Sequence, residues 1–165
     1  MVDKLNSMRL LEQRDIPYEA LHYPSEIRDA AEVAEALGVP YFTVYKTLVV
    51  QAVKDPGETK PYIVLVPSEL QLDLKKMALA AGVKKVKMAS HSDAEALTGL
   101  QVGGISPLAL MDKTWRVFLD QTATQLQHIV ISAGQRGTQL RVPVTPLMSL
   151  LRPRIVDVSK EPDNV

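Results

Sequence analysis

Apolar residues fall into short runs along the chain, and the spacing within each run predicts its secondary structure. Runs with apolar positions every three or four residues predict helices, and short β-branched or aromatic runs predict strands. Helices are expected over about Leu5–Glu12, Asp29–Leu37, Leu74–Ala81, Ser92–Thr98 and Thr145–Leu151. Strands are expected over Tyr18–Tyr23, Val44–Val53, Tyr62–Val66, Val83–Met88, Trp115–Leu119, Ile129–Ser132, Gln139–Val142 and Ile155–Val158.

Polar and small residues mark the ends of these elements. Gly82 follows the third helix at the position where a left-handed residue ends a helix. Ser92 and Glu95 have the spacing of a capping box, which predicts that the fourth helix begins at Ser92. A polar turn over 55–61 joins two strands into an expected hairpin. Because hairpins and helices both connect the strands, the sequence predicts an α/β domain with a mixed, curved sheet.

The length and composition fit one domain. The chain has 165 residues, of which 46% are hydrophobic, enough to build a single core. Neither a linker nor an internal repeat interrupts the expected elements. We therefore predict one domain over residues 1–160, followed by a frayed tail at 161–165.

Charge and cysteine content exclude several classes of function. The 19 Lys and Arg residues balance 19 Asp and Glu residues, so no global field draws the protein to nucleic acid or membrane, and any RNA contact must be local. The chain has no cysteine, which excludes disulfides, thiolate metal sites and a protein thiol nucleophile. Its apolar runs are too short for membrane spans, and its charged N-terminus differs from a signal peptide. We expect a cytoplasmic protein.

Lys46 is the first candidate for chemistry. Side chains alternate along a strand, so Lys46 shares its face with the apolar Val44, Leu48 and Val50. An ammonium group among apolar neighbours requires an anion, a carbonyl dipole or a lowered pKa. The alternative is a side chain that extends along the sheet to solvent and has no function.

Two loops of small residues are candidates for anion binding. Gly103 and Gly104, followed by Pro107, can present successive N–H groups to an oxyanion or a phosphate, although they also fit a plain tight connection. The loop from Ser132 to Gly137 carries Arg136, whose guanidinium could reach a phosphate. It lacks the Lys-Ser/Thr pair of a P-loop.

The remaining polar residues offer neither a metal site nor a protein nucleophile. The three histidines are far apart in the sequence and lack the spacing of metal ligands, so no metal or other cofactor is expected. No G-x-S-x-G motif or Ser-His-Asp set is recognisable. The densest basic cluster is either a solvated face or a surface that steers a phosphate backbone. It consists of Lys75, Lys76, Lys84, Lys85 and Lys87.

Four motifs together resemble the YbaK family of Cys-tRNA(Pro) deacylases, which are related to the editing insertion domain of prolyl-tRNA synthetase. In order and spacing they are V-Y-K-T-L from Val44, Q-L-D-L-K-K from Gln71, V-G-G-I-S-P-L from Val102 and S-A-G-Q-R-G from Ser132. The likeness runs from about Leu5 to Ile155. It implies a compact mixed α/β domain with a curved, barrel-like sheet.

The resemblance also implies a function, the hydrolysis of a mischarged aminoacyl-tRNA by a free-standing editing enzyme. The family's essential lysine corresponds to Lys46, with Gly103 and Gly104 as backbone donors to the reacting ester. In such enzymes the thiol of the substrate cysteine is thought to attack its own ester. The expected partners are the tRNA acceptor end and prolyl-tRNA synthetase. The substrate-binding positions are Tyr23, Thr47, Ser106, Ser132, Gly134 and Arg136.

One position departs from the family pattern. Gln139 stands where YbaK-type members carry an aspartate. Because a carboxylate there could orient the substrate's amino group, the choice between cysteine and another small amino acid such as alanine stays open, as does the choice between thiol and water as nucleophile. Two other hypotheses are a catalytically silent module that binds aminoacylated acceptor ends or docks on the synthetase, and a small-molecule esterase. The absence of a nucleophile and base pair argues against the esterase.

Overall fold

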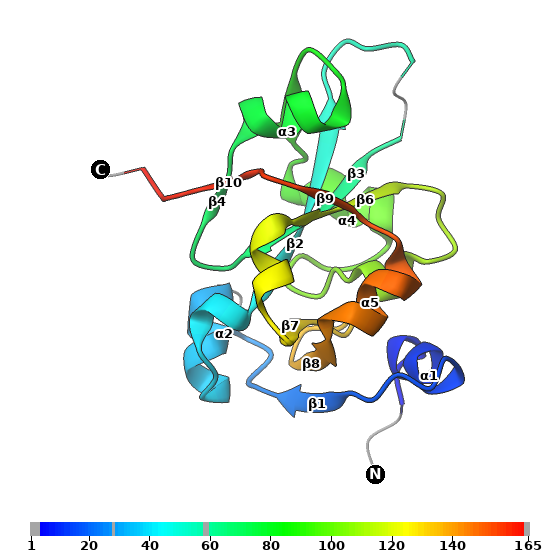
Figure 1. The fold of residues 1–165 in the computed structure, drawn as a ribbon, viewed down its shortest axis with the longest axis vertical. Coiled ribbons are helices and arrows are strands. Elements are labelled where there is room, and N and C mark those ends of the chain that lie inside the picture. The colour runs from blue at the N-terminus through cyan, green and yellow to red at the C-terminus, as the bar shows by residue number, and fades with distance from the viewer. Residues whose placement is uncertain (1–3, 28, 58–59, 164–165) are drawn as a thin grey trace.

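The computed structural model describes residues 4–27, 29–57 and 60–163, and these residues confirm the predicted mixed α/β fold (Figure 1). The helices are α1 (Asn6–Gln13), α2 (Ala30–Leu37), α3 (Leu74–Ala81), α4 (His91–Thr98) and α5 (Val144–Leu151), with 3-10 turns η1 (Tyr41–Thr43), η2 (Pro107–Leu110) and η3 (Gln121–Gln125). The strands are β1 (Glu19–His22), β2 (Tyr45–Ala52), β3 (Tyr62–Pro67), β4 (Gln71–Leu72), β5 (Val86–Met88), β6 (Arg116–Asp120), β7 (His128–Ser132), β8 (Thr138–Pro143), β9 (Arg154–Val156) and β10 (Ser159–Lys160).

The strands form three hydrogen-bonded sheets of mixed direction. The largest has the order β5-β2-β3-β6-β9, in which β2 and β3 form the predicted antiparallel hairpin and β6 and β9 run parallel to their neighbours. A second sheet has the antiparallel order β1-β8-β7, and β10 pairs with β4 in the third. The sheets do not close into a barrel. One isolated bridge, Val44 to Val130, joins the start of β2 to β7.

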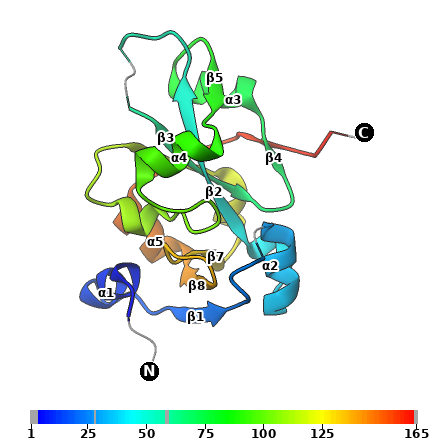
Figure 2. The ribbon, with the colours of Figure 1, turned by 180° about the vertical axis from the view of Figure 1, so that it is seen from behind.

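Helices cover both faces of the largest sheet, which explains why every residue of β3 is buried. On one face, Val50 and Val64 pack against Met77 of α3. On the other face, Val49 and Ile63 pack in a cluster that includes Ala94 of α4. Figure 2 shows α4 in front of β2 and β3, with α3 behind them. Alternating side chains of the hairpin thus face different helices, and Tyr45 and Leu65 enter a third cluster.

One stretch of β2 has no strand beside its outer edge. β3 pairs along one edge of β2, whereas β5 covers the other edge only from Val50. Between that point and the bridge at Val44, no described strand faces the edge. Across it, the Ala89 N–H donates to the Val49 carbonyl at 3.0 Å. Because alternate residues direct their main-chain groups to the same edge, the N–H and C=O of Thr47 point toward this opening.

Several element boundaries differ from the sequence prediction. The fourth helix is capped by Ser90, whose hydroxyl accepts the Asp93 N–H at 3.1 Å, so the predicted start at Ser92 is wrong. The predicted last strand, Ile155–Val158, corresponds to β9, which spans Arg154–Val156, and β10 after it was not predicted. Lys160 of β10 pairs with Gln71 of β4, and 164–165 of the predicted tail lie outside the described residues. The domain bounds stay a prediction.

Candidate active site

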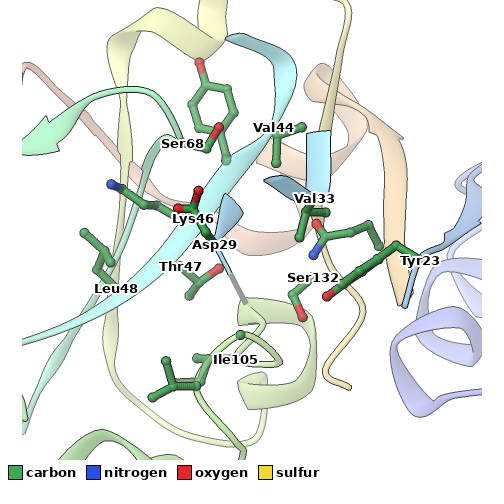
Figure 3. Close-up of a pocket in the computed structure, with 14 residues that line it drawn as sticks. Tyr23, Asp29, Val33, Val44, Lys46, Thr47, Leu48, Ser68, Ile105 and Ser132 are labelled. Carbon is green, nitrogen blue, oxygen red and sulfur yellow. The ribbon is translucent and has the colours of Figure 1, made fainter. Parts of the chain in front are cut away.

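A cavity of about 220 Å³ lies at the open edge of β2 (Figure 3). The elements that form it are β2, α2 with the segment before it, the residue after β3, the loop before η2, the end of β7, and β8. The residues that line it are Tyr23, Asp29, Val33, Val44, Tyr45, Lys46, Thr47, Leu48, Ser68, Val102, Gly103, Ile105, Ser132 and Gln139. It lies next to the Val44–Val130 bridge, by which β2 of the largest sheet contacts β7 of the second sheet.

Two polar side-chain atoms in the cavity wall are buried without a partner. They are Oγ1 of Thr47 and Oε1 of Gln139, for which the described residues supply no hydrogen bond. Gln139 is only 7% exposed. A buried polar group without a partner costs about 1–3 kcal/mol, so folded proteins rarely keep one unless a ligand or water completes it. These two oxygens are therefore acceptors in the cavity wall that the described residues leave available to a donor group.

Lys46 lies at the boundary of the cavity. Figure 3 shows its side chain leaving β2 on the side opposite the Thr47 hydroxyl, with Asp29 close to it. The side chain is half-buried, and burial lowers the pKa of the Lys46 ammonium, partly opposed by the negative charge of Asp29. As predicted, Lys46 shares its strand face with Leu48 and Val50, which contribute to the cluster beneath α3.

The two glycines of the first loop have different roles. Gly103 has φ of +91° and lines the cavity. The Gly104 N–H, in contrast, donates to the Gln101 carbonyl at 2.8 Å, and Gly104 does not line the cavity. A Cβ at Gly104 would lie 2.9 Å from the backbone nitrogen of Arg136. Gly104 therefore allows close packing of two loops, and its predicted role as an oxyanion donor is replaced by this structural one.

Hydrogen bonds fix the second loop against the first. Arg136 donates from Nε to the Val102 carbonyl at 2.6 Å, so this nitrogen holds the loops together, and the side chain lies outside the cavity wall. The Gly134 N–H donates to Ser132 Oγ at 3.1 Å. At the other end of the loop, the Tyr23 N–H donates to the Gly137 carbonyl at 3.0 Å. These bonds place Ser132 and Tyr23 in the wall.

The contacts of Ser106 stabilise the loop and do not reach the cavity. Ser106 is fully buried, and its Oγ accepts the Leu108 N–H at 3.2 Å as the cap of η2. Ser106, Gly104, Gly134 and Arg136 thus surround and support the cavity wall, whereas the predicted residues that line it are Tyr23, Lys46, Thr47, Gly103 and Ser132.

A buried polar network lies behind the cavity. The hydroxyl groups of Tyr45 and Thr122 are 2.7 Å apart, and Thr122 Oγ1 donates to Asp120 Oδ2 at 2.7 Å. The other carboxylate oxygen of Asp120 accepts the N–H groups of Val158 and Ser159. Burial raises the pKa of the Tyr45 phenol to about 12. The network fixes Tyr45, the residue before Lys46, relative to the C-terminal segment.

Comparison with known proteins identifies the family. Residues 24–150 match the family described as the aminoacyl-tRNA editing domain. The chain belongs to this family. Membership confirms the class of enzyme expected from the sequence, an editing enzyme that acts on aminoacyl-tRNA.

Two curated relatives of this editing domain show how much of each protein is shared. EbsC of Enterococcus faecalis, named for Cys-tRNA(Pro)/Cys-tRNA(Cys) deacylase activity, is 38% identical over 158 residues, which cover 94% of this chain and 93% of EbsC. The proline–tRNA ligase of Limosilactobacillus fermentum is 26% identical over 106 residues, which cover 64% of this chain and 18% of the ligase.

Solved structures share the fold of this editing domain. Hypothetical protein APE2540 aligns with a TM-score of 0.83 at 26% identity, over 94% of this chain and 99% of that one. A structure described as a trans-editing enzyme for prolyl tRNA synthetase aligns with a TM-score of 0.78 at 23% identity, over 96% of this chain and 99% of that one. Both proteins therefore share the fold of this chain.

Sequence reasoning missed several residues of the cavity wall. Asp29 and Val33 come from the start of α2, and Ser68 follows β3. Only the tertiary approach of these segments to β2 brings them to the site, so no local pattern could reveal them. Gln139 was singled out as a departure from the family pattern, but its burial and its unpartnered oxygen were not predictable from that departure.

Neither a metal site nor a membrane span is visible in the part of the chain that the structure describes. No group of three or more His, Cys, Asp or Glu side chains there could hold a metal ion. None of its helices combines the length and hydrophobicity needed to cross a bilayer.

Proposed function

We propose that this chain is a free-standing editing enzyme that hydrolyses the ester between cysteine and the 3′ end of tRNA(Pro). The observation that carries the proposal is the 220 Å³ cavity, whose wall contains the unpartnered oxygens of Thr47 and Gln139 as well as Lys46. Pockets for drug-sized ligands measure about 300–1,000 Å³, so this volume suits a small aminoacyl group. Similarity to EbsC over nearly the whole chain supports cysteine as that group.

Thr47 and Gln139 are assigned to the α-amino group of the substrate. An ammonium group has three donors and no acceptor, and it therefore needs oxygen atoms around it. The Thr47 hydroxyl, the Gln139 side-chain oxygen and the Thr47 carbonyl at the open edge of β2 supply three such atoms. The neutral amide of Gln139 thus accepts where a carboxylate would accept in YbaK-type proteins.

Gly103 is assigned to the carbonyl oxygen of the ester, and Lys46 to the nucleotide that carries the ester. The N–H of Gly103 faces the developing charge on the carbonyl oxygen, which a preorganised donor stabilises in the transition state. Lys46, at the boundary of the cavity, holds a phosphate of the terminal nucleotide and so fixes the ester over the strand. Tyr23 and Ser132 complete the wall around the aminoacyl group.

The nucleophile comes from the substrate in this proposal. The cavity wall contains neither cysteine nor histidine, and among the described residues the hydroxyl of Ser132 is hydrogen-bonded to the Gly134 N–H and to no basic side chain. The thiol of the cysteinyl group attacks its own ester carbon, the C–O bond to the ribose breaks, and the thiol proton passes to the departing ribose oxygen. Water then opens the resulting thiolactone to free cysteine. Amino acids without a thiol require direct attack by water.

A panel of charged tRNA(Pro) species tests this function. We expect rapid loss of cysteine and at least a hundredfold slower loss of serine, because serine has nearly the same shape but a much weaker nucleophile. Equal loss of cysteine and serine would mean that water attacks. Tight binding of every species with hydrolysis of none would instead support a silent binding module.

We also propose transient association with prolyl-tRNA synthetase in the cytoplasm, where tRNAs are charged. A chain with balanced charges gains little selectivity for one tRNA from its overall field, so a partner that already holds tRNA(Pro) would supply it. Co-purification of the synthetase with the tagged chain, at low salt and in the presence of tRNA(Pro), is the expected result. Absence of the synthetase under these conditions would contradict the association.

A further inference from the structure

A second cavity, of about 650 Å³, adjoins the first and shares Lys46 and Leu48 with it. Its wall is built by β2, β4, β5, β10 and the start of α3. Figure 1 shows the paired strands β4 and β10 next to each other. The residues that line it are Lys46, Leu48, Gln71, Leu72, Asp73, Leu74, Lys75, Met88 and Lys160. The aminoacyl group assigned to the smaller cavity leaves this space unused.

The charge of the larger cavity is positive, although the whole chain is neutral. Three lysines line it against one acidic residue, Asp73. The carboxylate of Asp73 accepts the N–H groups of Lys75 and Lys76 at 3.0 and 3.1 Å, so it is directed toward the start of α3. Lys160 has an exposed contact of 3.7 Å with Asp163, a pairing that contributes little and exchanges readily with another anion.

The floor of the larger cavity is apolar and partly exposed. Leu74 is 39% and Met88 41% exposed, and both lie with Leu48 in the cavity wall. Thioether and aliphatic side chains suit the face of a planar ring, and Gln71 adds a donor and an acceptor for its edge. Cations, an apolar floor and one amide together match a nucleoside with an adjoining phosphate.

We infer that the larger cavity binds the terminal nucleoside and the neighbouring phosphate of an RNA 3′ end, while the smaller cavity binds the aminoacyl group. This inference rests on the proposed function, because only an ester that joins an amino acid to a nucleotide occupies both cavities at once. The shared wall at Lys46 and Leu48 then lies beneath the ribose that carries the ester. Lys75 and Lys160 contact phosphate on the far side.

Removal of the two outer lysines tests the inference. Relative to the unaltered chain, the double variant Lys75→Ala and Lys160→Ala should raise KM for Cys-tRNA(Pro) about tenfold and change kcat less than twofold. The slope of log kcat/KM against log salt should become shallower by about one to two, because each phosphate contact releases about one counterion. Lys113→Ala is the matched control, since Lys113 is an exposed lysine stacked on Trp115 outside this cavity.

A direct binding measurement separates this inference from the proposed function. The probe is a fluorescent RNA hairpin with a single-stranded CCA 3′ tail that carries no amino acid. Binding that the double variant weakens and the control retains supports the cavity assignment, even if no charged tRNA is hydrolysed. Equal binding by all three proteins, no binding by any of them, or an equal loss in the control would overturn it.

Discussion

At the scale of single residues, the unpartnered oxygen of Gln139 links stability to function. Gln139→Leu replaces a buried, unsatisfied amide by an apolar side chain, so the free energy of unfolding should stay level or rise by about 1 kcal/mol. The kcat/KM for Cys-tRNA(Pro) should fall at least tenfold, because the α-amino group loses an acceptor. Thermal unfolding and deacylation assays measure the two effects.

Gln139→Glu provides the comparison at the same position. A carboxylate retains the acceptor and should keep most of the activity at neutral pH. A large loss of stability in Gln139→Leu, or unchanged activity, would contradict the assignment to the amino group.

Lys46 gives the stability a pH dependence of known sign. Burial lowers its pKa in the folded chain, so in the pH range between that value and the ordinary lysine value of about 10.4 the unfolded chain binds more protons. The free energy of unfolding contributed by Lys46 therefore rises with pH across this range. Lys46→Met has no titrating group at this position. Below this pH range its free energy of unfolding should exceed that of the unaltered protein, and the difference should shrink as the pH rises through the range. Chemical denaturation of both proteins at several pH values measures the difference, and one that grows with pH would contradict the sign.

At the scale of elements, close packing of two loops depends on Gly104. Gly104→Ala should destabilise the protein by about 1–3 kcal/mol, because the new Cβ would lie 2.9 Å from the Arg136 backbone and force the loops apart. Gly57→Ala is a suitable control, since the nearest atom to its Cβ would be a side-chain oxygen of Asp55 at 3.4 Å. Equal melting temperatures of the two variants would show that the loops tolerate separation.

Local sequence patterns predicted the elements better than their boundaries and contacts. The alternation in Val44–Val53 placed Lys46 and Thr47 on opposite faces of one strand, as observed. The strands β4 and β10 were missed because each has only two residues and exists by pairing with a distant segment. Likewise, Ser90 and Ser92 are both acceptable caps, and the backbone geometry before His91 decides between them.

The candidate site followed from the sequence only in part. Family motifs identified Lys46, Thr47 and Gly103, which the fold brings to one cavity. The same motifs also contained Gly104 and Arg136, whose N–H and Nε groups donate to the carbonyls of Gln101 and Val102. A motif records both binding and packing constraints, and only the three-dimensional contacts separate them.

At the scale of the whole molecule, the balanced charge limits the contact with RNA. The two cavities offer three lysines, Lys46, Lys75 and Lys160, so few phosphates are neutralised. Between 50 and 200 mM salt, a plot of log kcat/KM for Cys-tRNA(Pro) against log salt concentration should have a slope of about −2 to −3. The reason is that each phosphate contact releases about 0.7–0.9 counterions. A slope steeper than about −5 would require an extensive basic surface elsewhere on the protein.

The central claim, that Lys46 and the adjoining small cavity form an editing site, is tested most directly by one measurement. Deacylation of Cys-tRNA(Pro) should be compared for the unaltered chain and Lys46→Ala under single-turnover conditions, with thermal unfolding recorded for both. We predict a rate at least a hundredfold lower for Lys46→Ala at an unchanged or slightly raised melting temperature. Near-normal deacylation by Lys46→Ala would contradict the claim.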